Sequence, residues 1–223
     1  VACLAGLLSG LDTSVNIAFP AITAAFEIDV SQIQWVVVSF VLTYSVLLLP
    51  AGRLGDRIGH GRIMVIGIVV QGLAFVWCSL ASSFEFFLLA RVSQGASMAL
   101  ILGTAPALVT LSVSERHQPR ALGIFAMTTA AGLAAGAPVG GLLLQAWDWQ
   151  SVYAFRVPYM GVLLVAALLS GLHRPGVMKS KQPLDLFGAV PLALGLGLTL
   201  FVASRGLMWG WTSPITIALA LVA

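Results

Sequence analysis

The sequence "GRLGDRIGHGR" at residues 52–62 gathers charge and glycine in a chain that is otherwise strongly apolar. Of the 223 residues, 59% are hydrophobic and 9% are charged, whereas a soluble domain carries about 25% charged residues. Such a chain cannot cover itself with a polar surface, so the lipid bilayer is its expected solvent. The segment 52–62 then marks a place where the chain leaves the lipid.

Apolar runs of the length that crosses a bilayer, about 20 residues, lie on both sides of this segment. Backbone polar groups have no partners in lipid, so each run is predicted to be a helix. The alternation that a membrane barrel requires is absent from the sequence. We therefore predict an all-α, polytopic transmembrane bundle with spans at 1–25, 34–52, 63–81, 86–112, 121–145, 153–172 and 186–204, and an eighth that starts at 214.

Lysine and arginine are concentrated in every second predicted loop, namely 53–62, 113–120 and 173–185. The positive-inside rule places these loops in the cytoplasm. The last of them, "HRPGVMKSKQPLD", is longer than the others and contains two prolines. It predicts a boundary: a six-helix bundle at 1–172, a basic cytoplasmic linker at 173–185, and an extra span with the start of the next at 186–223. The lipid bilayer is the expected partner, and basic residues confined to short loops do not indicate nucleic acid.

The segment 52–62 is predicted to be a cytoplasmic turn between the second and third spans. Its glycines allow tight turns, and Asp56 lies beside Arg53 and Arg57, where it could also cap a neighbouring helix. A charge cluster that holds in one state and opens in another would act as a conformational latch; a solvated loop is the alternative. The predicted latch residues are Gly52, Asp56, Arg57, Gly59 and Arg62.

The same segment resembles the loop signature of the major facilitator superfamily, G-x-L-a-D-r-x-G-r-k. His60 and Gly61 replace the two basic residues at the end of that signature, and Arg62 follows one place later. "RVSQGASMA" at 91–99 resembles the fourth-span motif of the family. "GLAAGAPVGG" at 132–141 resembles the fifth-span antiporter motif with its proline displaced to Pro138.

Two further segments resemble one branch of the family, the 14-span drug:proton antiporters. They are "LDTSVNIAFP" at 11–20, similar to the first-span motif, and residues 184–214, similar to the extra central span and the loop after it. The resemblance implies the N-terminal six-helix half of such a transporter, with a C-terminal half as its missing partner. It also implies a small-molecule substrate and the bacterial inner membrane as location.

The resemblance further implies proton-coupled efflux of drugs or small apolar metabolites by alternating access. The proton gradient supplies the energy, and no cofactor or metal is expected. No Walker loop, zinc ligand set or nucleophile triad is visible in the sequence, so we do not expect an enzyme. The alternatives are a specific metabolite permease or importer of the same superfamily, or a non-transporting truncated membrane module.

Two charged residues lie well inside predicted spans. A charge at the bilayer centre costs about 2.5–3.5 kcal/mol on insertion scales, so Arg91 must face the bundle interior and find partners. Asp12 is a candidate partner and a candidate proton carrier, because burial favours its neutral form and a nearby arginine its charged form. The resemblance assigns proton coupling to Arg91; a structural polar anchor is the alternative.

Four more residues are candidates for a substrate cavity: Asn16, Tyr44, Gln94 and Arg156. Hydrogen bonds between helices and plain packing are the alternatives for the first three. Arg156 is expected near the outer end of the sixth span, where it either extends outward or pairs with Asp148.

Small residues recur every four positions in the fifth span, at Gly132, Gly136 and Gly140, and so share one helix face. This spacing predicts close approach of another helix. Pro138 removes one backbone hydrogen bond and predicts a kink, and Gly141 completes the antiporter motif.

Overall fold

The computed structural model describes residues 1–174 together with 191, 195, 197–199 and 202. The predicted linker beyond residue 174 and most of the predicted extra span lie outside these residues. The regular elements of the part described are helices, which confirms the all-α prediction. They are α1 (Ala2–Gly10), η1 (Leu11–Thr13), α2 (Ser14–Ile17), α3 (Phe19–Ala25), α4 (Gln34–Ile58), α5 (His60–Ser79), α6 (Phe84–Leu111), η2 (Glu115–His117), α7 (Gln118–Ala146), α8 (Ser151–Ala154) and α9 (Arg156–Leu169).

Five of the described helical segments are long and apolar enough to cross a membrane, and a bent pair of helices provides a sixth span. Large apolar side chains are exposed around them, as a lipid-facing surface requires. Leu73 is 64% exposed and Leu169 is 84% exposed. The chain is therefore a membrane-spanning helix bundle.

The first span is broken, so the prediction of one continuous helix over 1–25 is wrong. Its halves, Ala2–Ile17 and Phe19–Ala25, meet at an angle of 57°. Pro20 stands at the start of α3, where it can begin a helix but cannot continue one. Earlier in the span, η1 interrupts the α-helix, and the Thr13 hydroxyl donates to the Gly10 carbonyl oxygen. The first span thus combines a 3₁₀ turn at Leu11–Thr13 with a bend before Phe19.

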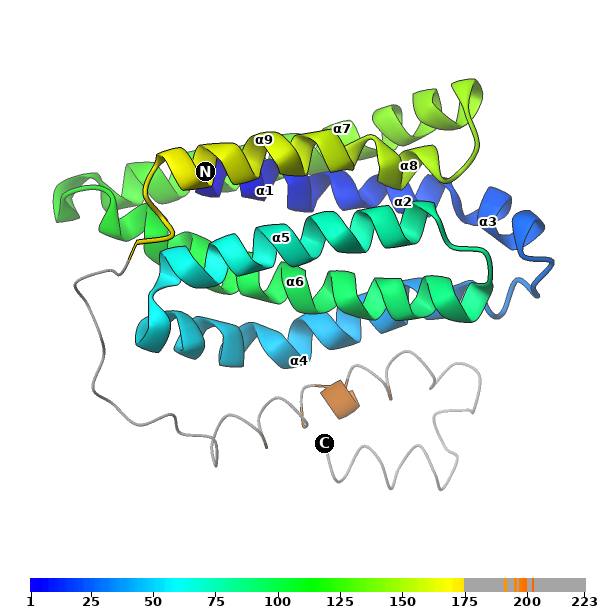
Figure 1. Cartoon of the computed structure of the whole chain (residues 1–223), viewed down its shortest axis with the longest axis horizontal. Coiled ribbons are helices and arrows are strands. Elements are labelled where there is room, and N and C mark those ends of the chain that lie inside the picture. Colours follow the sequence, from blue (N-terminus) through cyan, green and yellow to red (C-terminus); the bar gives the residue numbers. More distant parts are fainter. Residues whose placement is uncertain (175–190, 192–194, 196, 200–201, 203–223) are drawn as a thin grey trace.

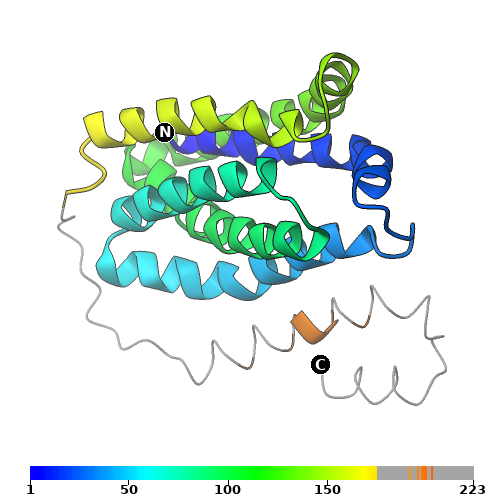
Figure 2. The same cartoon turned by 45° about the vertical axis from the view of Figure 1, so that its right-hand side comes forward.

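α6 lies at the centre of the bundle and contacts α4 and α5 along its length (Figures 1 and 2). α1 packs along α7, and these two helices form the upper layer of Figure 1 together with α9. The buried residues Phe87, Ala99 and Thr104 point in three different directions around the axis of α6, so the helix is covered on several sides. Charged side chains of α6 must therefore be satisfied by neighbouring helices.

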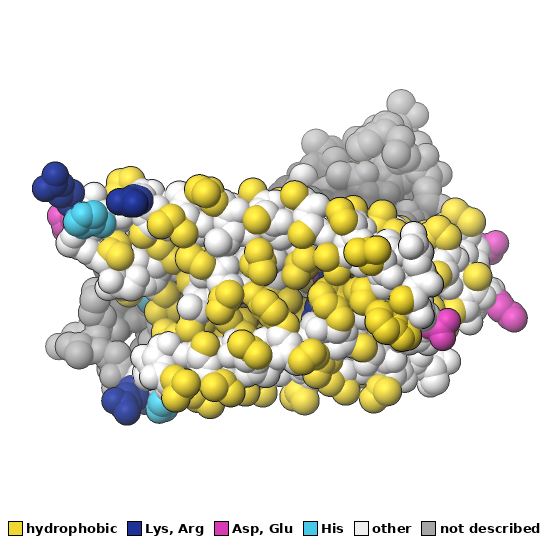
Figure 3. Space-filling view, turned by 90° about the horizontal axis from the view of Figure 1, so that it is seen from above, with side chains coloured by type: hydrophobic (Ala, Val, Ile, Leu, Met, Phe, Trp, Pro, Cys, Tyr) yellow, Lys and Arg dark blue, Asp and Glu magenta, His cyan; other side chains and the backbone are white. Residues whose placement is uncertain are grey.

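The two ends of the bundle carry opposite charge. The connections around Gly59, η2 and residues 170–174 lie together at one end (Figure 1). Figure 3 shows basic and histidine side chains at this end, most of the acidic side chains at the other, and a hydrophobic belt between them. We call the first the basic end and the second the acidic end.

The connection between α4 and α5 is much shorter than predicted. α4 continues to Ile58 and α5 begins at His60, so Gly59 is the only residue between them. Its φ of 109° is accessible to glycine and rare for other residues. The predicted turn over 52–62 is thus wrong, because residues 52–58 form the last two turns of α4. Charged residues can continue a helix where it leaves the lipid.

Candidate functional site

Asp12, Arg91 and Arg156 meet inside the bundle although they come from three different helical segments. The Asp12 Oδ2 atom lies 3.7 Å from Arg91 Nη2, and Asp12 Oδ1 lies 3.3 Å from Arg156 Nη1. The carboxylate is thus held between α6 and α9. Together with Gln94, these residues form what we call the charge cluster.

Gln94 bridges Asp12 and Arg91. Arg91 Nη1 donates to Gln94 Oε1 at 2.6 Å, and Gln94 Nε2 donates to Asp12 Oδ1 at 3.0 Å. Arg91 also reaches α4, because its Nε donates to the Val36 carbonyl oxygen at 3.1 Å. One arginine therefore connects the broken first span, α6 and α4.

Arg156 is bound to the first span at η1. Its Nη2 donates to the Leu11 carbonyl oxygen and to Ser14 Oγ, both at 2.5 Å. The side chain is fully buried, while Asp148 is exposed. Both expectations for Arg156, outward extension and a pair with Asp148, are wrong. The Leu11 carbonyl oxygen, which also accepts from the Ser14 N–H, gives this guanidinium an interior acceptor.

Aromatic rings surround both guanidinium groups. Arg91 Cζ lies 4.4 Å from the centroid of the Phe40 ring, and Arg156 Cζ lies 5.3 Å from that of Phe75. Such contacts favour a desolvated cation. Exposure differs sharply within the cluster, since the side chains of the arginines are 2% and 0% exposed and that of Asp12 is 16% exposed. The carboxylate is the charged group that reaches the surface.

The predicted cavity residues do not share one surface. Asn16 is exposed, and Tyr44 is half-buried with its ring stacked on Phe40 at 6.2 Å between centroids. Gln94 and Arg156 are both 0% exposed, so they hold the charge cluster together and do not line an open cavity in this conformation. Only the first two stand where a ligand could touch them.

The glycine face of α7 packs on the broken first span. An added Cβ would overlap the Leu7 carbonyl oxygen at Gly132 and the Thr13 side chain at Gly136. At Gly140 the added Cβ would lie 2.9 Å from the Ser14 carbonyl oxygen. Thr13 Oγ1 also donates to the Leu133 carbonyl oxygen at 3.3 Å.

The other two residues of the antiporter motif contribute nothing comparable to this contact. Gly141 has no neighbour within 4 Å of an added Cβ. Pro138 lies inside α7, which continues unbroken from Gln118 to Ala146. The first span is thus held by the glycine face of α7 and by the two arginines.

At the basic end, Asp56 Oδ1 lies 3.0 Å from His60 Nε2. This contact crosses the Gly59 turn and joins α4 to α5, so the residue that departs from the family signature is the partner of Asp56. Arg62 Nε donates to the His173 carbonyl oxygen at 3.4 Å, which links α5 to the end of the sixth span. A Cβ on Gly52 would lie 3.3 Å from the Gly103 carbonyl oxygen, so α4 and α6 approach closely here.

If the complete protein is the transporter that the sequence motifs imply, Asp56→Asn should slow its transport about two- to fivefold, because an exposed charge pair contributes little free energy. Substrate preference should stay the same, since the pair lies at the end of the bundle. Initial transport rates for two or more substrates measure both effects. Asp29→Asn, an exposed change at the acidic end, is the control, and a changed preference without a slower rate would contradict a latch role.

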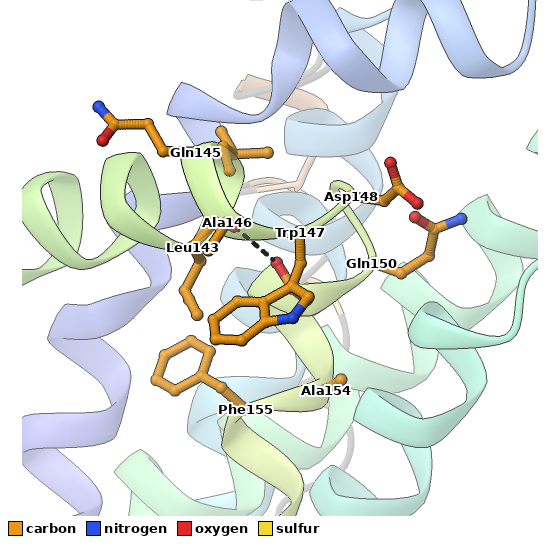
Figure 4. A pocket seen from close by; sticks show the side chains of 10 residues that line it. Leu143, Gln145, Ala146, Trp147, Asp148, Gln150, Ala154 and Phe155 are labelled. Carbon is orange, nitrogen blue, oxygen red and sulfur yellow. Dashed lines mark hydrogen bonds between the residues drawn. The ribbon is translucent and has the colours of Figure 1, made fainter.

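An open groove of about 880 Å³ lies at the acidic end, between the end of α7 and α8. Figure 4 shows the Trp147 and Phe155 side chains close together, with Asp148 and Gln150 on the other side of the turn. No member of the charge cluster lines it. No group of three or more His, Cys, Asp or Glu side chains that could hold a metal lies among residues 1–174 or the other described positions.

Comparison with known proteins places this architecture in a family. The Major Facilitator Superfamily matches residues 2–223. The multidrug resistance protein Stp of Mycobacterium tuberculosis (strain ATCC 25618 / H37Rv) is 31% identical over 206 residues, 92% of this chain and 38% of that protein. The riboflavin transporter RibZ of Clostridioides difficile (strain 630) is 27% identical over 194 residues, 86% of this chain and 42% of that protein.

The solved structures agree in fold. A bacterial homologue of the human lysosomal transporter Spinster, in an inward-facing and occupied conformation, superimposes with a TM-score of 0.64 at 22% identity. The match covers 93% of this chain and 51% of that one, so the chain spans about half of the proteins it matches. By the family match over nearly its whole length, the chain belongs to the Major Facilitator Superfamily.

Proposed function

We propose that this chain forms one half of a secondary active transporter that exports drugs or small apolar metabolites in exchange for protons. The observation that carries this proposal is Asp12, a partly exposed carboxylate held between arginines of two different helices. A carboxylate in that position can bind a proton and change helix contacts in one step. The similarity to a multidrug resistance protein supports the class of substrate.

Protonation of Asp12 acts unequally on its two partners. Both contacts of Arg91 with the first span end at Asp12: one is the direct ion pair, and the other runs through Gln94, which donates to Asp12. The remaining hydrogen bond of Arg91 goes to Val36 on α4. Arg156 has two further acceptors on the first span, the Leu11 carbonyl and the Ser14 hydroxyl. Loss of the carboxylate charge therefore loosens α6 from the first span and leaves α9 attached.

This difference converts proton binding into a change of helix packing. A ligand shifts a conformational equilibrium only by its differential affinity for the two states. A proton that weakens one of two helix contacts has such a differential affinity. In alternating access, the half containing this chain would then rock against a second half around a substrate held between them.

The test uses the whole transporter in proteoliposomes with an imposed pH gradient. We expect substrate movement in one direction and proton movement in the other, with both abolished by a protonophore. Asp12→Asn should retain substrate exchange without a pH gradient and lose the response to the gradient, because the site stays uncharged. A full pH response in Asp12→Asn would contradict the assignment of Asp12.

The similarity to a riboflavin transporter favours a second candidate, a permease for one specific metabolite. Such a permease would move one substrate and reject a chemically varied panel, with or without proton movement. Absence of any transport would favour a non-transporting membrane module. In each case we propose the bacterial inner membrane as location, with the basic end in the cytoplasm, as the positive-inside rule requires.

A further inference from the structure

The charge cluster contains two guanidinium groups and one carboxylate. Arg91 and Arg156 are nearly or fully buried, and the ion pairs of both go to Asp12 among the described residues. With Asp12 ionised, the cluster thus has a surplus of one positive charge. With Asp12 protonated, the surplus is two.

Neutral groups bind most of the remaining donors of the arginines, while Arg156 Nε is buried without a hydrogen-bond partner in the part of the chain that the structure describes. Arg91 donates to the Val36 carbonyl and to Gln94, and Arg156 donates to the Leu11 carbonyl and Ser14. The rings of Phe40 and Phe75 lie near the two guanidinium groups. Dipoles and ring quadrupoles stabilise a buried cation, but they do not cancel its net charge. Within the described residues, the surplus charge is thus accommodated without an ion pair to a second acid.

The surplus charge lies next to a surface that a ligand can reach. The Asp12 side chain is 16% exposed, and Asn16, one turn further along the first span, is exposed. Asn16 is uncharged, and so are two residues of α4: Phe40, whose ring lies beside Arg91, and Tyr44, which stacks on Phe40. Charges act over longer distances in a medium of low dielectric constant than in water. A ligand at this surface therefore meets a positive potential.

We propose that the charge cluster selects substrates without positive charge and that Arg156 is the residue that determines this selection. This inference rests on the proposed function and adds the charge class of its substrate. Arg156 is the determinant because Asp12 and Arg91 alone would form a neutral pair. Arg91 is also the link to α4, so its removal would change the helix contacts as well as the charge.

The experiment compares two flat aromatic probes that differ in charge: riboflavin, which is uncharged, and ethidium, which is a permanent cation. Initial export rates of both are measured for the full-length protein in proteoliposomes, and the ratio of ethidium to riboflavin is the readout. The unmodified protein should export riboflavin faster. Arg156→Gln should raise the ratio about tenfold or more, because a local potential of this kind changes ligand concentration by at least that factor.

Two variants separate charge from structure. Arg156→Lys keeps the charge and should keep the ratio, although it loses part of the hydrogen bonding. Arg120→Gln makes the same chemical change at an exposed position of the basic end and should leave the ratio unchanged. If Arg156→Gln does not fold, Asp12→Asn replaces it, and its equilibrium binding of ethidium relative to riboflavin should fall because the surplus charge increases.

The outcomes distinguish this inference from the proposed function. Proton-coupled export of ethidium as fast as riboflavin, or an unchanged ratio in Arg156→Gln, would overturn the charge selection and leave the proposed function standing. A charge preference without proton coupling would overturn proton exchange and leave the selection standing. Export of neither probe would overturn both.

Discussion

Arg91→Ala is expected to lower proton-coupled transport by the whole protein at least 100-fold. The substitution removes three contacts at once, to Val36, Gln94 and Asp12. Truncating one partner of a buried ion pair costs about 3–5 kcal/mol, and each 1.36 kcal/mol corresponds to a factor of ten in rate. α6 then keeps only the hydrogen bond from Gln94 to the carboxylate and loses its ion pair, so protonation of Asp12 changes the contact between the first span and α6 far less.

The measurement is pH-driven substrate movement in proteoliposomes, with the amount of protein inserted into the membrane determined in parallel. Insertion should be unaffected, since an alanine in an apolar helix favours the bilayer. Arg91→Lys keeps a charge but cannot make all three contacts in the same geometry, so it should retain only part of the activity. Arg116→Ala, an exposed change at the basic end, is the matched control, and normal transport by Arg91→Ala would disprove the coupling role.

Gly132→Ala should destabilise the protein by about 3 kcal/mol, near the upper end of the range for overpacked sites. The added methyl group would overlap the Leu7 carbonyl oxygen. That atom belongs to the backbone and cannot turn aside, so α7 and the first span must separate. Transport should be lost together with stability, because the same segment of the first span carries Asp12.

Gly141→Ala is the matched control, since it makes the same change in the same helix. No atom lies within 4 Å of the added Cβ, and alanine favours a helix over glycine by about 0.8–1 kcal/mol. This variant should therefore be as stable as the unmodified protein or slightly more stable. The midpoint of thermal unfolding in detergent measures both, and equal midpoints for the two variants would contradict the packing assigned to the glycine face.

The spans were predictable because apolar length alone determines whether a segment can cross the bilayer. Their interruptions were not. The 3₁₀ turn at η1 and the bend at the start of α3 both lie in an apolar run, and hydropathy does not report which backbone hydrogen bonds are made. The opposite error concerns residues 52–58, where charge predicts a loop but the helix continues to Ile58.

The site was predictable where a single residue is unusual in its sequence context. Arg91 and Asp12 stand out because a charge in an apolar span needs a partner. Their contact depends on helix packing, which no local pattern encodes. The sequence offers Arg156 two alternatives, outward extension or a pair with Asp148 eight positions away, whereas its partner Asp12 lies 144 positions away. The position of Arg156 in an otherwise apolar span indicates that its side chain faces the interior of the bundle. Ser14, two residues after Asp12, is a polar residue of the first span that could have been predicted as a further acceptor for Arg156.

The unequal numbers of acids and bases in the charge cluster also connect this protein to membrane voltage. A unit charge that crosses the whole bilayer gains or loses about 2.3 kcal/mol per 100 mV. Two buried arginines and one carboxylate have a net positive charge. This charge is displaced in the membrane field whenever the half that holds it changes its position relative to the bilayer. The surplus charge would thus make that movement sensitive to the membrane potential. In the proposed exchange of a neutral molecule for one proton, one net charge would cross the bilayer per cycle, so the resting potential of the cell would be a second source of energy.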